Sequence, residues 1–402
     1  MKILWVNQYF LHPTERGGQI RSMGILKPLH RRHEVHYAAL ADPLSSEGLE
    51  MAHTFSSRAY AIPHPVVSRR SPAFALQLGR HLLFSDLPLS VDRYASSALR
   101  AAVSDLVARE HFDAIVCDFA ASAVNMPNLN GAVVFQHNVE TTIFERHAEH
   151  AATPVHRWFY ELQVRRMRAY EQQVCRECAH VIAVSPIDAQ RMRDMFGITN
   201  VSDVATGVDV EYYRNPGGHE HDTDFVFVAS MDWLPNVDGI LWFAEEILPL
   251  LRRAKPDCSV AIVGRWPDPR LLALAEADPR ITVTGTVADV RPYLWRARVS
   301  ILPLRIGGGT RMKVYEAMAA EVPMVSTQVG MEGLACVPGR DILVADAPQE
   351  FARHCMTLLE NPDLGRSIAA SALHLVQEEC SWDAVSKQFE DVLVNVSQNG
   401  SA

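Results

Sequence analysis

The sequence predicts an α/β protein with two Rossmann-like, doubly wound domains that face each other across a cleft. Three observations lead to this fold class. The length of 402 residues suits two or three domains. Short apolar, β-branched runs alternate with helix-length amphipathic stretches throughout, which is typical of parallel βαβ units. A polar segment without periodicity, residues 215–224, separates two such series, so that each series is expected to form its own sheet.

The first domain is expected over residues 1–205. Its apolar runs predict parallel strands at Lys2–Val6, Glu34–Ala38, Ala114–Asp118, Ala132–His137 and His180–Ser185. The amphipathic stretches predict helices at Gly18–His30, Ser96–Glu110 and Val155–Cys178. Functional side chains of such sheets gather where parallel strands have their carboxyl ends.

The second domain is expected over residues 206–380. Its predicted strands are Asp224–Ser230, Ser259–Gly264, Ile281–Gly285, Val299–Leu304, Pro323–Thr327 and Ile342–Val344. Its predicted helices include Val237–Arg253 and Thr310–Ala320. Ser381 is suited to cap a last helix that starts at Trp382. We expect this segment, residues 381–402, to cross back to the first domain.

Charge and hydropathy exclude several classes of protein. The 38 basic and 47 acidic residues give a net charge of −9, which argues against a nucleic-acid partner. No apolar run approaches the roughly 18 residues of a membrane span. The apolar start, Met1–Val6, is too short for the core of a signal peptide. These observations predict a cytoplasmic protein.

The strongest local motif is the glycine-rich turn between a predicted strand that ends at Leu304 and a predicted helix. Glycines let backbone N–H groups approach a ligand, and a helix N-terminus offers free donors and a positive dipole end. Basic residues follow directly, which suits a diphosphate. The alternative is a flexible turn with a capped helix and a surface ion pair. The candidate residues are Gly307, Gly308, Gly309, Thr310, Arg311, Lys313 and Glu316.

A second pair of glycines, Gly17 and Gly18, follows the first predicted strand and opens the first helix. Its spacing is not that of the dinucleotide motif G-x-G-x-x-G, so NAD binding is not expected. The pair is either a plain turn or, opposite the first motif, a second source of donors to the same pyrophosphate.

A third candidate is His137, in the run Gln136–Glu140 at the end of a predicted strand. An imidazole there could bind a substrate hydroxyl or pass a proton near neutral pH. The alternative is a structural histidine with satisfied hydrogen bonds.

No metal site and no cofactor are predicted. Asp232 and Asp289 do not form the D-x-D pair that clamps a metal-bound phosphate. The ligand expected at the glycine-rich turn is therefore a substrate, a nucleoside-diphosphate sugar linked to UDP or GDP, held without a metal ion.

The motifs together resemble glycosyltransferase family 4, which has the GT-B fold. The resemblance is carried by Gly307–Ala319, Pro323–Thr327, Gly330–Leu334, Ser230–Asn236, Ile262–Gly264, Val283–Gly285, Asp289–Tyr293 and Gln136–Glu140. It implies metal-independent sugar transfer with retention of configuration. It also implies that Gly17 and Gly18 approach the phosphates, His137 the donor sugar and Glu316 the ribose.

The chain departs from this family at two points. The first of the two glutamates in the family's donor motif falls at Gly308, where a backbone contact from Gly308 or Gly309 is expected instead, as in the branch with the G-G-G-T-R signature. The Arg/Lys pair that usually follows the first strand of the second domain is missing. Arg265, Arg311 and Lys313 are the expected substitutes.

The resulting prediction is a retaining glycosyltransferase of cell-surface polysaccharide or glycolipid synthesis, with His137 and Arg311 as catalytic residues. The first domain would bind the acceptor and the second the nucleotide sugar. Two alternatives stay open. One is a nucleotide-sugar epimerase on the same fold, and the other is a non-catalytic nucleotide-sugar-binding subunit, which the glycine at position 308 favours.

The acceptor is predicted to be a saccharide, either free or linked to a lipid. One helical stretch is rich in arginine and begins with Trp158 and Phe159; its cations are Arg157, Arg165, Arg166, Arg168 and Arg176. Four of the five fall within an arc of about 100° on an ideal helix. This face suits peripheral contact with the anionic inner face of a membrane. The alternative is a solvated face paired with Glu161, Glu171 and Glu177.

Overall fold

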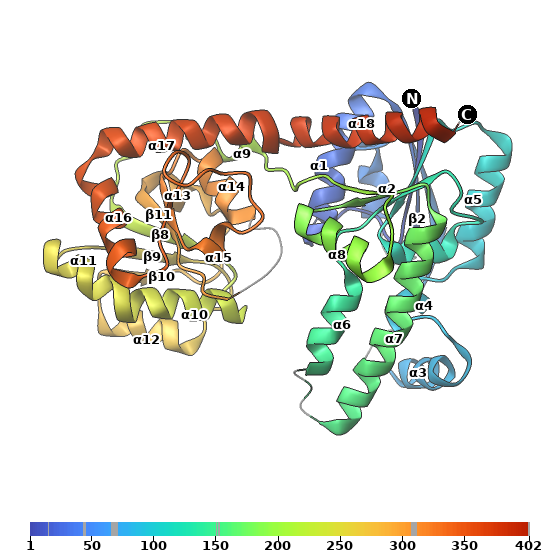
Figure 1. The fold of residues 1–402 in the computed structure, drawn as a ribbon, viewed down its shortest axis with the longest axis horizontal. Helices are drawn as coiled ribbons and strands as arrows, with labels where there is room; N and C mark the ends of the chain where they lie inside the picture. The colour runs from blue at the N-terminus through green and yellow to red at the C-terminus, as the bar shows by residue number, and fades with distance from the viewer. Residues whose placement is uncertain are drawn as a thin grey trace. The chain divides into compact units, whose positions relative to one another are not determined.

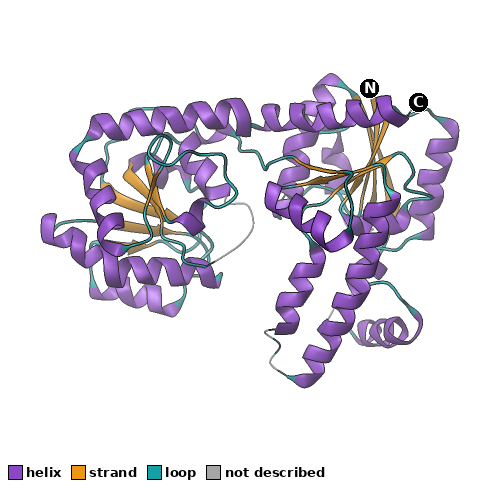
Figure 2. Cartoon of the chain, viewed as in Figure 1, coloured by secondary structure: helices purple, strands orange, loops and turns teal. Residues whose placement is uncertain are grey.

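The computed structural model describes residues 1–14, 16–42, 46–65, 71–149, 151, 153–306 and 312–400. The chain divides into two compact units, residues 1–205 with 385–402 and residues 206–384. Each unit is an α/β body in which helices surround a sheet (Figure 2). Two parallel sheets confirm the predicted fold class.

The sheet of unit 1 has the order β3-β2-β1-β4-β5-β6-β7, and every neighbouring pair in it is parallel. Its strands are β1 Lys2–Asn7, β2 Glu34–Ala41, β3 Arg58–Pro63, β4 Ala114–Asp118, β5 Ala132–Phe135, β6 His180–Ala183 and β7 Val201–Asp203. The central strands are buried almost throughout, as expected for a sheet covered on both faces.

Two strands of this sheet were not predicted. Both β3 and β7 are edge strands. The strand β3 carries Arg58 and Pro63 at its ends and is only partly buried, so it lacks the continuous apolar run of a central strand. The strand β7 is three residues long, which is too short for a periodic signal.

The helices of unit 1 connect these strands. They are α1 Gly17–Arg32, α2 Glu47–Glu50, η1 Met51–Thr54, α3 Pro72–Phe84, α4 Leu89–Asp92, α5 Ser97–Arg109, η2 Ala120–Asn125, α6 Glu140–Glu149, α7 Pro154–Glu177 and α8 Pro186–Phe196. The helices α6 and α7 pack along each other as a hairpin (Figure 1). None of the described helices is both long and apolar enough to cross a membrane.

The sheet of unit 2 has the order β10-β9-β8-β11-β12-β13 and is also parallel. Its strands are β8 Thr223–Val228, β9 Val260–Val263, β10 Ile281–Val283, β11 Ala297–Leu302, β12 Met324–Ser326 and β13 Leu343–Val344. Phe225, Ile262 and Ile301 lie in its buried core. Most of these strands end one or two residues earlier than predicted, because the predicted ranges included the turn residues that follow each strand.

The helices of unit 2 are α9 Val210–Tyr213, α10 Leu234–Trp242, α11 Leu248–Ala254, α12 Pro269–Ala277, α13 Arg291–Arg296, α14 Met312–Ala319, α15 Gln328–Met331, α16 Pro348–Glu360 and α17 Pro362–Leu375. The single helix predicted over Val237–Arg253 is wrong in one respect. A π-helical segment, η3 Phe243–Ile247, separates α10 from α11. Pro249 in the first turn of α11 has no N–H to continue the α-helical ladder across this point.

The last helix, α18 Trp382–Gly400, follows a second π-helical segment, η4 Val376–Cys380, and belongs to unit 1 from Val385 onward. Phe389 is fully buried, with its ring centroid 5.4 Å from that of Trp5 and 5.1 Å from that of Phe135. Arg32 on α1 forms an ion pair of 2.8 Å with Glu390. The end of the chain therefore contributes to the core of unit 1.

Candidate functional site

Asp118, the last residue of β4, is the centre of a buried polar network at the carboxyl edge of the sheet in unit 1. One carboxylate oxygen, Oδ2, accepts hydrogen bonds from Trp5 Nε1 at 2.9 Å, Asn7 Nδ2 at 2.7 Å and Ser22 Oγ at 2.6 Å. The other, Oδ1, lies 2.6 Å from His137 Nε2. A fully buried carboxylate held by four donors is a fixed negative charge at this edge.

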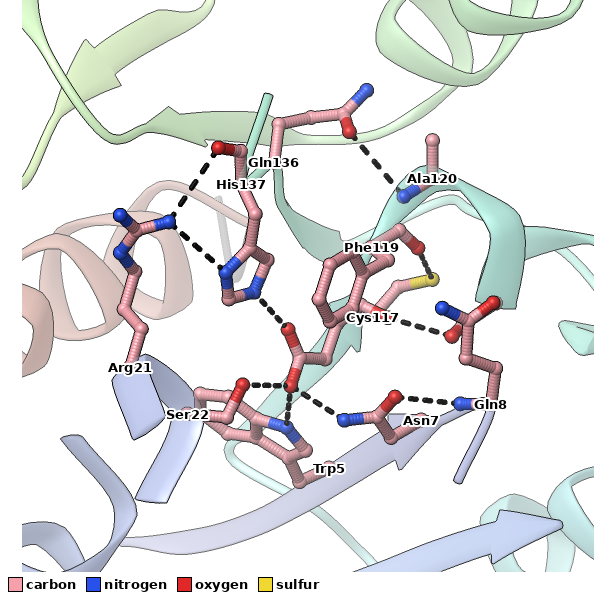
Figure 3. Close-up of polar contacts among 12 residues, drawn as sticks. Trp5, Asn7, Gln8, Arg21, Ser22, Cys117, Phe119, Ala120, Gln136 and His137 are labelled. Atoms are coloured by element: carbon pink, nitrogen blue, oxygen red, sulfur yellow. Dashed lines mark hydrogen bonds and ion pairs between the residues drawn. The ribbon is translucent and has the colours of Figure 1, made fainter. Parts of the chain in front are cut away.

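His137 follows β5 and has protein partners on both ring nitrogens. Arg21 Nη1 lies 3.3 Å from His137 Nδ1, so Arg21 donates to Nδ1 while Nε2–H donates to Asp118 (Figure 3). Burial lowers the pKa of His137, and the nearby Asp118 carboxylate only partly opposes that shift. Burial also lowers the pKa of Arg21 to about 10, which leaves the guanidinium charged at neutral pH. His137 is therefore a neutral imidazole between a cation and an anion.

The ring of Phe119 fixes the plane of this imidazole. The two ring centroids are 3.8 Å apart and the planes differ by 12°. Phe119 itself has a φ of 67°, in the left-handed region. A Cβ on Gly18 would lie 2.4 Å from Phe119 Cζ, whereas a Cβ on Gly17 would meet nothing within 4 Å. Gly18 is thus required by packing against Phe119, and Gly17 is the glycine with open space around it.

The loop that carries His137 is held from behind by Glu171 of α7. Its buried carboxylate accepts hydrogen bonds from the backbone N–H of Glu140 at 2.9 Å and from the N–H and hydroxyl of Thr141 at 2.9 and 2.6 Å. Gln136 Nε2 lies 3.4 Å from the same carboxylate. Burial raises the pKa of Glu171 to about 7, against the lowering effect of these donors. Both ends of the loop therefore depend on one side chain.

In unit 2, the carboxyl ends of β8 and β9 bring together the polar residues that follow them. Lys313, in the first turn of α14, donates to Asn236 Oδ1 at 2.7 Å, and Asn236 Nδ2 donates to the Ser230 carbonyl oxygen at 2.7 Å. Arg265 Nε donates to Ser230 Oγ at 3.1 Å. Gly264, with a φ of 154°, lets β9 pass against Ala229, where any Cβ would overlap the backbone. Arg265 and Lys313 are thus both linked to Ser230, which follows β8: Arg265 directly and Lys313 through Asn236.

Glu316 lies one turn further along α14 and is half-buried. Its carboxylate forms a hydrogen bond with the hydroxyl of Tyr213 from α9. Burial raises the pKa of Glu316, and the hydrogen bond from Tyr213 together with the charge of Lys313 opposes that shift. A carboxylate oriented by a tyrosine and flanked by a cation is suited to accept hydrogen bonds from hydroxyl groups.

Five predicted site residues, Gly307–Gly309, Thr310 and Arg311, lie outside the described residues. Over the parts of the chain that the structure describes, no group of three or more His, Cys, Asp or Glu side chains is arranged to hold a metal ion.

Two of the four arginines on the predicted face of α7, Arg168 and Arg176, have protein partners. Arg168 forms an ion pair of 2.7 Å with Glu145 of α6, Arg176 donates to the Phe196 carbonyl, and Arg166 contacts His81. The alternative, a face paired with Glu161, Glu171 and Glu177, is wrong for Glu171, because its carboxylate is buried against Thr141. Arg157 and Arg165 remain exposed.

Sequence reasoning missed several residues of these two clusters: Asp118, Arg21, Glu171, Asn236 and Tyr213. Asp118 carried a usable signal, because it is a charged residue at the end of an otherwise apolar predicted strand. The others carried none. Their roles come from contacts between elements that are distant in sequence, such as α1 with the loop after β5.

Comparison with known proteins defines the class. Residues 222–361 match the family model described as glycosyl transferases group 1. The whole chain also matches solved structures of the GT-B fold, which confirms the predicted fold. The family match therefore lies within unit 2, and the similarity over the whole chain is one of fold.

Individual similarities are distant. An uncharacterized 44.6 kDa protein in the cps region of Klebsiella pneumoniae is 22% identical over 165 residues, which are 39% of this chain and 42% of that protein. The chain spans about half the length of the curated relatives it matches. Sucrose-phosphate synthase from Thermosynechococcus elongatus has a TM-score of 0.65 at 15% identity, covering 99% of this chain and 100% of that one. HepE from Anabaena, solved in complex with UDP, has a TM-score of 0.64 at 15% identity over 98% of this chain and 100% of its own.

Proposed function

We propose that this protein is a retaining glycosyltransferase that moves a sugar from a nucleoside-diphosphate sugar to an acceptor hydroxyl. The observation that carries the proposal is the match of residues 222–361 to the group 1 family, in the unit where Arg265, Lys313 and Glu316 gather. The structures of HepE with UDP and with UDP-glucose support a UDP-linked donor, with GDP as the other candidate base.

Unit 2 binds the nucleotide sugar and unit 1 binds the acceptor in this proposal. The family match lies in unit 2, which supports its assignment to the donor. The relative in a cps region supports a product in cell-surface polysaccharide or glycolipid synthesis. The acceptor is a saccharide, free or lipid-linked, and the enzyme works on the cytoplasmic side of the membrane.

Departure of the nucleoside diphosphate places negative charge on the β-phosphate. Arg311, Lys313 and Arg265 are the cations that stabilise this charge, together with backbone N–H groups of Gly307, Gly308, Gly309 and Thr310. Preformed donors of this kind replace the divalent ion that other transferases use. A backbone contact from Gly308 or Gly309 takes the place of the family's first glutamate, as in the G-G-G-T-R branch.

The acceptor oxygen attacks the anomeric carbon from the side that the diphosphate leaves. The bond from that carbon to the β-phosphate oxygen breaks, and the hydroxyl proton passes to the departing oxygen, so that configuration is retained. His137 contacts the transferred sugar when a sugar hydroxyl replaces Arg21 as the hydrogen-bond donor to its Nδ1. Gly17, with open space around it, lets the backbone approach the phosphates. Glu316, oriented by Tyr213, accepts hydrogen bonds from the ribose hydroxyls.

Incubation of the protein with a panel of nucleotide sugars, followed by mass spectrometry, tests the proposal. We expect release of one nucleoside diphosphate, either slowly to water or faster with an acceptor saccharide. A changed sugar still attached to its nucleotide would identify an epimerase instead. Tight binding of a nucleotide sugar with no turnover would identify a non-catalytic binding subunit.

A further inference from the structure

The helix α3 exposes an apolar face. The side chains of Leu76, Leu83 and Phe84 are 78%, 77% and 82% exposed, respectively. On a helix these positions and Arg80 fall within an arc of about 100°. Single exposed apolar side chains are common, but a row of three on one helix face is not, and it marks a surface that binds something.

The opposite side of α3 is fixed to the rest of unit 1. His81 is buried, and its Nδ1 lies 2.9 Å from Asp92 Oδ2 while its Nε2 lies 3.0 Å from Arg166 Nη1 of α7. Arg93 lies over the ring of Phe74, 5.9 Å from its centroid. These contacts determine which face of α3 points outward, so the exposed row does not result from an unattached helix.

The start of α7 also exposes apolar side chains. Val155 is 72% exposed and Trp158 is 54% exposed. Figure 1 shows α3 beside the N-terminal half of α7, in agreement with the contact between His81 and Arg166. We call the row Leu76, Leu83 and Phe84 on α3 the apolar patch of unit 1.

The charges in these segments select the partner. Residues 71–85 and 154–165 contain three arginines, Arg80, Arg157 and Arg165, and one carboxylate, Glu161. Among the described residues, none forms an ion pair with any of the three arginines, in contrast to Arg168. Leu and Phe side chains that insert between acyl chains, with Trp and Arg at the level of the headgroups, are the composition of a helix that lies in a membrane interface.

We propose that the apolar patch docks unit 1 on a lipid bilayer that carries anionic headgroups. The arginines attract the headgroups, and the row on α3 enters the acyl region. This inference extends the proposed function, because an enzyme docked in this way would meet a lipid-linked acceptor in the plane of the bilayer. Only that consequence rests on the proposed function. Docking itself does not depend on sugar transfer.

Co-sedimentation with vesicles tests the docking. The full chain should bind vesicles of equimolar phosphatidylcholine and phosphatidylglycerol at least about tenfold better than vesicles of phosphatidylcholine alone. Binding should weaken between about 50 and about 300 mM salt, because screening shortens the reach of the arginines. The variant with Leu76→Ser, Leu83→Ser and Phe84→Ser should lose at least about tenfold in binding, since these side chains leave water on docking.

Matched variants make the result specific. Leu272→Ser removes an exposed leucine on α12 of unit 2 and should bind vesicles as the parent does. Arg80→Glu with Arg165→Glu should abolish the preference for phosphatidylglycerol. The docking proposal is overturned if the parent chain does not bind anionic vesicles at low salt, or if the triple variant binds them equally well.

A dimer of the parent chain that the triple variant loses would likewise overturn the proposal, because a second copy would then cover the patch. UDP binding, measured on the same preparations, shows that the variants are folded. Retained UDP binding without vesicle binding would leave the glycosyltransferase proposal intact.

Discussion

The carboxylate of Glu171 on α7 binds both the backbone N–H and the hydroxyl group of Thr141 on α6. These bonds occupy donors at the N-terminus of α6, a position where a negative charge is stabilised. The loop held in this way contains His137. The long hairpin of α6 and α7 and the network around Asp118 are therefore joined by one ionisable side chain.

Glu171→Gln should change how stability depends on pH. The pKa of Glu171 is about 7 in the fold and 4.5 in the unfolded chain, so the unfolded state releases this proton first as pH rises. The Glu171 contribution is therefore lost between about pH 4.5 and 7, by roughly 3 kcal/mol in total. The variant has a neutral amide at this position, so its free energy of unfolding should not show this decrease. Denaturant unfolding of both proteins from pH 5 to 8 measures the two free energies of unfolding. Equal dependence of these free energies on pH in the two proteins would contradict the prediction.

His137→Ala should lower kcat by roughly 10²–10⁴ and leave UDP affinity nearly unchanged, because the side chain would contact the sugar rather than the nucleotide. Steady-state kinetics and calorimetric titration measure the two effects. Asp118→Asn is the companion variant, since Asp118 determines which nitrogen of His137 carries the proton. A His137→Ala protein that keeps more than about a third of kcat would show that this histidine is structural.

Lys313→Ala should weaken UDP binding by roughly 1.5–3 kcal/mol, as for a charged hydrogen bond to phosphate, and Arg311→Ala should do the same. Isothermal titration gives the affinity. Arg353→Ala, which removes an exposed arginine of α16, is the control for the loss of one positive charge. Equal affinities for UDP in the Lys313→Ala protein and its parent would remove Lys313 from the phosphate site.

Glu316→Gln should weaken binding of UDP but not of inorganic pyrophosphate, because the proposed partner of this carboxylate is the ribose. Tyr213→Phe should produce a smaller loss in the same direction, since Tyr213 only orients the carboxylate. Competition titrations with the two ligands separate the effects. Equal losses for UDP and pyrophosphate would place Glu316 at the phosphates.

Sugar transfer should survive an excess of EDTA, because cationic side chains and backbone donors balance the charge of the leaving diphosphate. Turnover is compared before and after chelation, with Mg²⁺ or Mn²⁺ then added back. Activity that disappears with EDTA and returns with either ion would contradict the proposed role of Lys313 and Arg265.

The sequence was sufficient for the architecture because strand and helix periods are local signals. Central strands such as β4 were predicted to the residue, whereas edge strands such as β3 mix charged residues and proline with apolar ones. The candidate site was predictable only where a motif is contiguous, as around Lys313 and Glu316. Arg21 is buried beside His137 by tertiary packing alone, 116 residues away in sequence, and no local pattern encodes such a pair.

The contribution of α18 to unit 1 also has a consequence for biosynthesis. Val385, Phe389 and Leu393 are fully buried, and Phe389 packs against Trp5 on the first strand. A ribosome makes Trp5 before, and Phe389 after, all strands of unit 2. The core of unit 1 therefore stays incomplete until Phe389 has been made, after the strands of unit 2. Of the two units, the one whose synthesis begins first is also the one whose segments are completed last.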